Sequence, residues 1–130
     1  NLLLDGAHNP AGALILAQAL RAEFSEKPLV VVIAVLAEKD ATGLFSNLAG
    51  VFESVVITQS SSPRSMPVAE LESLAKDGLG QEVESISDFK LALERAKQRA
   101  IEIDGTVVVT GSITLVGDVI KLIQEESDEE

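Results

Sequence analysis

The sequence predicts an α/β fold of the Rossmann-like, doubly wound type, in which helices flank a mainly parallel sheet. Three observations indicate this fold. Short apolar runs alternate with longer amphipathic segments five times, the runs are rich in β-branched residues, and glycine, proline or aspartate separates one segment from the next. Because parallel strands joined by crossovers all end at one edge of the sheet, the loops at that edge should form a single rim. The expected rim loops are Asp5 to His8, Ala37 to Asp40, Gln59 to Arg64, Ser87 to Asp88, and Gly111 to Ser112.

The first strand and the first helix are predicted from the opening two dozen residues. Leu2 to Leu4 form the end of a buried strand, and Asn9 and Pro10 are the cap and first-turn residues of a helix that runs to about Phe24. An apolar stripe at helical spacing is expected to face the core: Leu14, Ala17, Leu20 and Phe24.

The later elements follow from the same kinds of signal. The predicted strands run from Leu29 to Leu36, Ser54 to Thr58, Glu82 to Ile86, and Thr106 to Thr110. The predicted helices run from a cap at Asp40 through Leu48, from about Val68 to Asp77, from a cap at Ser87 or Asp88 to about Ile101, and from Ile113 to about Gln124. Gly50 and Gly78 are expected to end the helices that precede them.

Composition excludes several classes of function. A net charge of −11 and the absence of Trp and Tyr argue against nucleic-acid binding, and the absence of cysteine excludes disulfides, thiolate zinc sites and cysteine nucleophiles. Without a long apolar run or a signal-type start, we expect a cytoplasmic protein that does not contact membranes. The chain begins inside a strand, so we expect a fragment of a longer protein. We expect one domain, residues 1–124, and a disordered acidic tail, residues 125–130.

The block LDGAHNPAGA, from Leu4 to Ala13, places a turn between a strand end and a helix N-terminus. Open α/β sheets bind ligands at such turns, because backbone N–H groups and the positive end of the helix dipole point there. Two interpretations stay open. Asp5 either satisfies amides of its own turn or accepts hydrogen bonds from ligand hydroxyls, and His8 is either a partly exposed loop residue or faces a phosphate or carboxylate at the helix N-terminus.

Two further blocks follow later strands. In TGSITLVG, Gly111 permits a tight turn and Ser112 either caps the next helix or, with neighbouring N–H groups, holds a ligand carboxylate. In SSPRSMP, Arg64 is the only arginine expected on the rim, and it is either solvated or held for bidentate contact with a carboxylate. The sequence contains neither a Walker A loop nor a G-x-S-x-G nucleophile elbow.

Taken together, LDGAHNPAGA, VLAEKD, SSPRSMP and VVVTGSITLVGDV resemble the C-terminal domain of the Mur ligase superfamily, and more narrowly that of folylpolyglutamate synthase/dihydrofolate synthase. The resemblance extends to about Ile123. In the family the last motif commonly reads GSLYLVG, whereas Ile113 and Thr114 stand here in place of the Leu and Tyr.

The resemblance implies an ATP-dependent amide ligase. In this family a central domain of the same chain, with a phosphate-binding loop and Mg²⁺, phosphorylates the carboxylate of a folate-type substrate, and the amine of L-glutamate then attacks the acyl phosphate. By analogy with the family, Asp5 contacts the ATP ribose, and Asn9 also lies on the nucleotide side. His8 is the catalytic residue, near the phosphates or the incoming glutamate. Ser112 and Arg64 hold that glutamate. The Mg²⁺ ligands would lie outside this chain, which is therefore expected to be inactive alone.

Two other functions are compatible with the same residues. One is the C-terminal domain of a peptidoglycan-precursor ligase, in which another amino acid supplies the amine. The other is a non-catalytic, nucleotide-binding α/β module that shares the fold but not the chemistry. A glycine-rich loop with Lys and a Mg²⁺ site upstream of Asn1 would favour the ligases.

Overall fold

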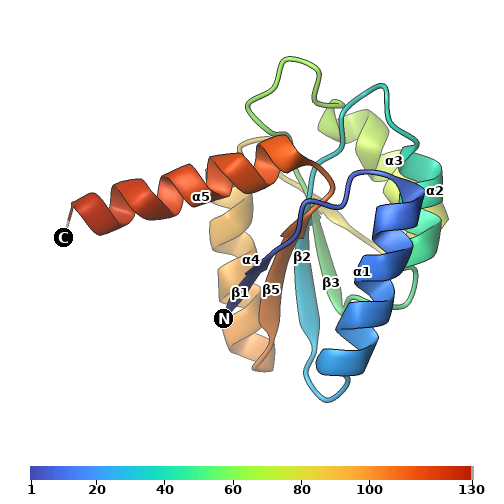
Figure 1. The fold of residues 1–130 in the computed structure, drawn as a ribbon, viewed down its shortest axis with the longest axis horizontal. Helices are drawn as coiled ribbons and strands as arrows, with labels where there is room; N and C mark the ends of the chain where they lie inside the picture. Colours follow the sequence, from blue (N-terminus) through green and yellow to red (C-terminus); the bar gives the residue numbers. More distant parts are fainter. Residues whose placement is uncertain (130) are drawn as a thin grey trace.

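A computed structural model describes residues 1–129 and contains a five-stranded sheet with the order β1-β5-β2-β3-β4, in which every neighbouring pair is parallel (Figure 1). The strands are β1 (Leu2–Leu4), β2 (Leu29–Ile33), β3 (Ser54–Ile57), β4 (Glu84–Ser85) and β5 (Thr106–Thr110). The helices are α1 (Pro10–Glu23), α2 (Ala41–Leu48), α3 (Val68–Leu79), α4 (Phe89–Ile103) and α5 (Ile113–Asp128). The predicted alternation and the predicted fold class are confirmed.

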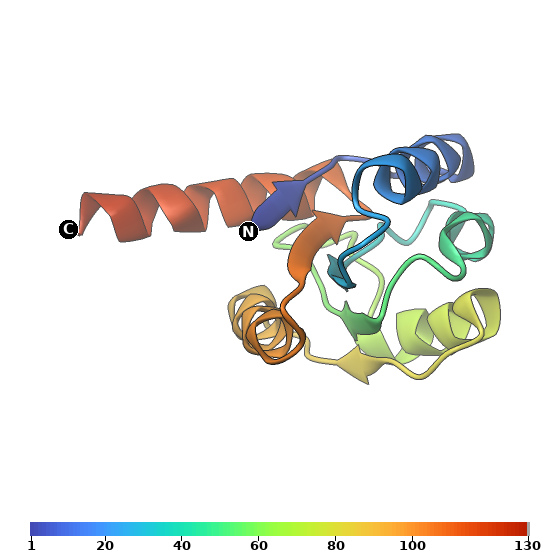
Figure 2. The same cartoon turned by 90° about the horizontal axis from the view of Figure 1, so that it is seen from below.

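Two apolar cores lie on opposite faces of the sheet. Alternate residues of β2 point to opposite faces, so Val31 and Ile33 join one core while Val30 and Val32 join the other. Helices α1, α2 and α3 cover the first face, and α4 and the start of α5 cover the second; Figure 2 separates α1, α2 and α3 from α4 on the two sides of the sheet. Burial on both faces explains why β2 and β5 are buried along their whole length.

The buried face of α1 differs from the predicted stripe. Ala17 and Leu20 are buried as predicted, but the first turns bury Ala13 and Leu16, and Leu14 is 45% exposed. The prediction for Leu14 is therefore wrong. Five apolar residues in a row, Ala13 to Ala17, leave the buried face of the helix ambiguous, and packing against α2 and the sheet determines it.

Helix α3 continues past the predicted stop at Gly78 and ends at Gly80, which adopts φ +68°. Gly78 lies inside the helix because α2 and α3 pack closely there: a Cβ at this position would be 2.6 Å from the Cβ of Phe45. This glycine is a packing residue, and the true C-terminal glycine follows two positions later. The neighbouring strand β4 is also shorter than predicted, with only Glu84–Ser85 paired to β3.

Helix α5 extends beyond the predicted end at Gln124 to Asp128, and Figure 1 shows its C-terminal part projecting from the body of the domain. Residues 125–128 are helical, so the prediction of a disordered tail is wrong for these residues. Glu130 lies outside the described residues. Glutamate is a good helix former, and neither Gly nor Pro follows Gly117. The domain boundary at residue 124 stays a prediction. Within residues 1–129, no helix has the length and apolar character that crossing a bilayer requires.

Polar caps begin four of the five helices. Asn9 accepts a hydrogen bond from the Gly12 N–H at 2.8 Å, and Ser112 accepts one from the Leu115 N–H at 2.9 Å. Asp40 and Asp88 cap α2 and α4 in the same way. Because the strands are parallel, all these caps stand at the carboxyl edge of the sheet, and they orient the rim loops.

Candidate functional site

The turns that follow β1 and β5 are hydrogen-bonded to each other. The Asp5 N–H donates to the Val109 carbonyl at 3.0 Å, and the Gly111 N–H donates to the Ala7 carbonyl at 3.0 Å. Gly111 adopts φ +100°, and a Cβ there would lie 2.3 Å from the Ala34 carbonyl oxygen, so only glycine fits this turn. The LDGAHNP and TGS blocks, more than 100 residues apart in sequence, therefore form one structural unit at the rim.

A cavity of about 290 Å³ opens beside this unit at the carboxyl edge. It is lined by His8, Leu36, Glu38, Lys39, Arg64, Ser112, Ile113 and Thr114. Three of the five predicted site residues, His8, Arg64 and Ser112, thus share one pocket although they come from three different loops. Asp5 and Asn9 do not line it. We refer to this cavity below as the rim pocket.

The His8 ring is oriented by its own turn. Its Nδ1 lies 3.0 Å from the Gly6 carbonyl oxygen, and because a carbonyl oxygen only accepts, Nδ1 carries the hydrogen and donates. Nε2 forms no hydrogen bond with another described residue, so in the neutral ring its lone pair is free to accept a proton. The side chain is half-buried in the wall of the rim pocket.

The Arg64 guanidinium is paired rather than free. Its Nη1 lies 2.9 Å from Oε1 of Glu38, and the two side chains are 68% and 43% exposed. The loop that carries Arg64 is joined to the loop after β2, because the Ala37 N–H donates to the Arg64 carbonyl at 2.8 Å and Leu36 forms a bridge with Ser65. Lys39 adds a second cation to the same wall.

Ser112 is buried, and its Oγ is occupied as the cap of α5. Accepting from the Leu115 N–H still leaves the hydroxyl hydrogen available for donation. The N–H groups of Ile113 and Thr114 belong to the first turn of α5, where backbone donors have no partner within the helix. The start of α5 therefore offers hydrogen-bond donors to the pocket, whereas Arg64 and Lys39 offer cations.

Asp5 and Asn9 lie next to the rim pocket, outside its wall. Asp5 uses Oδ1 to accept from the Ala7 N–H at 2.9 Å, while its Oδ2 forms no hydrogen bond within the described part of the chain. The Asn9 side-chain oxygen is engaged as the cap of α1. Among residues 1–129, no group of three or more His, Cys, Asp or Glu side chains is placed to bind a metal ion together.

Glu38 and Lys39 belong to the pocket although the sequence did not single them out as site residues. Both lie in the VLAEKD block and in a loop expected on the rim, so topology could have placed them there. The ion pair between Glu38 and Arg64 could not be foreseen, because it depends on the approach of two loops that are 26 positions apart.

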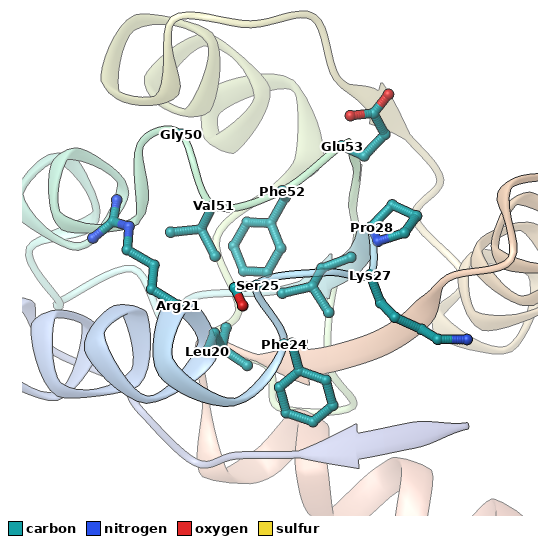
Figure 3. A pocket seen from close by; sticks show the side chains of 11 residues that line it. Leu20, Arg21, Phe24, Ser25, Lys27, Pro28, Gly50, Val51, Phe52 and Glu53 are labelled. Atoms are coloured by element: carbon teal, nitrogen blue, oxygen red, sulfur yellow. The ribbon is translucent and has the colours of Figure 1, made fainter.

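A second cavity, of about 330 Å³, lies at the opposite edge of the sheet, where β2 and β3 begin (Figure 3). Phe24, Phe52 and Arg21 form part of its wall, and Arg21 donates to the Ala49 carbonyl at 3.0 Å. None of the predicted site residues lines it, and the helix N-termini that favour anions are at the other edge. The rim pocket is therefore the candidate site.

Comparison with known proteins gives a consistent result. Residues 1–122 match the family described as "Dihydrofolate synthetase, C-terminal domain". A dihydrofolate synthase/folylpolyglutamate synthase of Mycobacterium tuberculosis is 36% identical in an alignment 129 residues long. The alignment covers 89% of this chain and 26% of that protein. A folylpolyglutamate synthase of Lacticaseibacillus casei is 31% identical over 119 residues, which cover 91% of this chain and 26% of that protein.

Solved structures agree with these relatives. The folylpolyglutamate synthase of M. tuberculosis in complex with ADP and AMPPCP superimposes with a TM-score of 0.88 at 35% identity, over 93% of this chain and 29% of that chain. The enzyme from Thermotoga maritima gives a TM-score of 0.79 at 38% identity, over 95% of this chain and 27% of that chain. The present chain thus spans less than a third of these proteins, and the match over residues 1–122 shows that it belongs to the dihydrofolate synthetase C-terminal domain family.

Proposed function

We propose that this domain is the glutamate-binding part of an ATP-dependent ligase that joins L-glutamate to the carboxylate of a folate or dihydropteroate through an acyl phosphate. The observation that carries the proposal is the convergence of His8, Arg64 and Ser112 on the rim pocket. The rest of the machinery would come from an ATPase domain of the same chain, consistent with the small share of each relative that this chain covers.

Arg64 is the residue that we assign to a glutamate carboxylate. Its ion pair with Glu38 is largely exposed, and exposed pairs contribute no more than about 1 kcal/mol. A substrate carboxylate can therefore replace Glu38 at little cost and gain a bidentate contact. Lys39 strengthens the positive potential on this wall, and the donors at Ser112 and the first turn of α5 complete the set of partners for an amino acid.

His8 is the residue that we assign to proton transfer. When the glutamate amine attacks the acyl phosphate, a C–N bond forms, the C–O bond to phosphate breaks with its electron pair leaving on inorganic phosphate, and the nitrogen must lose a proton. Because Nδ1 is held by the Gly6 carbonyl, Nε2 of the neutral ring is the position that takes this proton.

The nucleotide would lie beside the rim pocket, toward Asp5 and Asn9. Asp5 Oδ2 is free to accept from a ribose hydroxyl, and the N-terminus of α1 favours nearby phosphate charge. Relatives of known structure bind ADP and AMPPCP, and the Yersinia pestis enzyme binds AMPPNP with a Mn ion. We assign the ligands of the divalent ion to the upstream domain, as the resemblance to the ATP-dependent ligases implies.

The chain alone is expected to bind ATP no more tightly than about millimolar. A helix N-terminus contributes up to about 2 kcal/mol toward an anion and one charge-assisted hydrogen bond roughly 1.5–3, which together correspond to that affinity. Isothermal titration of ATP into the 130-residue chain measures this value. A micromolar dissociation constant would mean that the complete nucleotide site lies within this domain.

Replacing Asp5 with alanine tests the nucleotide assignment. In the protein that contains the upstream domain, D5A is expected to raise the KM for ATP by about tenfold, the effect of losing one hydrogen bond to a charged group. Steady-state kinetics with ATP varied at saturating glutamate measure the effect. The KM for glutamate should stay within twofold, and an unchanged KM for ATP would remove Asp5 from this role.

A further inference from the structure

The rim pocket has two walls, and only one pair of side-chain hydrogen bonds in the described residues joins the Arg64 loop to α5. The Ser61 N–H donates to Oδ2 of Asp118 at 2.7 Å, and the Ser61 hydroxyl donates to Oδ1 of the same carboxylate at 2.6 Å. Asp118 stands on α5, in the second turn after Ser112. Both oxygens of one carboxylate thus hold one residue of a loop that lies 57 positions earlier in the chain.

The other contacts of this loop run in a different direction. The Arg64 carbonyl accepts a hydrogen bond from the Ala37 N–H, and the Met66 N–H donates to the Val35 carbonyl. Both partners lie in the segment after β2. These backbone bonds make Arg64 and Glu38 members of one rigid wall. They do not reach α5, which contributes Ile113 and Thr114, next to its cap Ser112, to the lining of the pocket.

We propose that Asp118 is a positioning residue: by holding Ser61, it fixes the distance between the Arg64 loop and the first turn of α5, and so sets the width of the rim pocket for its amino-acid substrate. This inference rests on the proposed role of Arg64. Asp118 does not line the pocket, so it acts through the loop and not by contact with substrate. The geometry is bidentate and charge-assisted, which makes it stronger than an ordinary surface hydrogen bond.

The chain offers a conservative replacement. In D118N the amide oxygen can accept from the Ser61 N–H while the amide NH₂ donates to the Ser61 hydroxyl, so both bonds are preserved without the charge. D118A removes both. Glu125→Ala is the matched control, because Glu125 is on the same helix and its side chain makes no hydrogen bond or ion pair with another described residue.

The first measurement is amide hydrogen exchange by NMR in the 130-residue chain. D118A should speed exchange of the Ser61 amide at least about tenfold, because its acceptor is lost, whereas D118N and the Glu125 control should stay within about twofold of the wild type. Wild-type exchange of this amide in D118A would overturn the inference.

The second measurement is steady-state kinetics of the protein that contains the upstream domain. D118A should raise the KM for glutamate about three- to tenfold with kcat and the KM for ATP within twofold, and D118N should restore the value. If Arg64→Ala raises the KM for glutamate and D118A does not, the positioning role is wrong. If neither raises it while Ser61 exchange is faster in D118A, the assignment of Arg64 to glutamate fails, and this inference fails with it.

Discussion

Replacing Gly111 with alanine is expected to destabilise the domain by at least about 3 kcal/mol. The residue adopts φ +100°, which costs an L-residue roughly 1–2 kcal/mol. The added Cβ would also lie 2.3 Å from the Ala34 carbonyl oxygen and 2.6 Å from Cγ1 of Ile33. Relief requires the backbones of the paired strands β2 and β5 to move apart near their carboxyl ends, so the strain cannot be absorbed by a side chain.

Urea unfolding of the G111A chain measures this loss, and the same motif supplies the control. Gly117 lies on α5 in open space, with no atom within 4 Å of the position that a Cβ would take, so G117A should stabilise the chain by about 0.5–1 kcal/mol. If the free energy of unfolding of G111A lies within about 1 kcal/mol of the wild-type value, the turn geometry is wrong. The pairing of the LDGAHNP and TGS blocks depends on that geometry.

Replacing Arg64 with alanine is expected to raise the KM for glutamate about 10- to 100-fold in the protein that contains the upstream domain. The variant loses a bidentate contact worth roughly 1.5–3 kcal/mol, and it leaves Glu38 unpaired in the wall of the pocket, where it repels the anionic substrate. The KM for ATP should remain within about twofold. Kinetics with each substrate varied separately provide the measurement.

Two companion variants sharpen the test of Arg64. Glu38→Gln frees the Arg64 guanidinium from its ion pair, so the KM of this variant for glutamate should be equal to the wild-type value or lower. Arg21→Ala removes an arginine at the opposite edge of the sheet and should leave both KM values unchanged. An equal loss for every substrate in R64A would indicate impaired folding or domain closure instead of a glutamate contact.

Much of the fold could be predicted because local signals agreed with one another. The β-branched runs before Ala34 and Gly111 are long enough to be recognised as strands buried on both faces, and the caps at Asn9, Asp40 and Ser112 lie where short polar side chains precede apolar periodicity. Parallel topology then brought His8, Arg64 and Ser112 to one edge without any knowledge of contacts.

The predictions failed where contacts between elements or helix propensity, and not the local sequence signal, determine the structure. Gly78 has the sequence signature of a helix end, but close packing against Phe45 keeps it inside α3. The exposure of Leu14 depends on how α1 rotates against its neighbours, which its apolar run does not determine. The acidic residues after Gln124 suggested disorder from their charge, whereas their helix propensity prevails through Asp128.

The contacts that shape the rim pocket were likewise beyond the sequence. Nothing in the spacing of Glu38 and Arg64 predicts an ion pair, and nothing in Ser61 and Asp118 predicts two hydrogen bonds. Such pairs form only after the sheet has set the positions of the loops. Residue type and topology could therefore locate the pocket, but the hydrogen-bond and ion-pair partners of each side chain could be identified only in the folded structure.

The central claim is that the rim pocket binds the amino-acid substrate. A crystal structure of the protein with its upstream domain, soaked with L-glutamate and a non-hydrolysable ATP analogue, tests it most directly. We predict a glutamate carboxylate within about 3 Å of the Arg64 guanidinium, between His8 and Ser112, with the nucleotide ribose next to Asp5. Glutamate bound elsewhere, or nucleotide filling the rim pocket itself, would contradict the account.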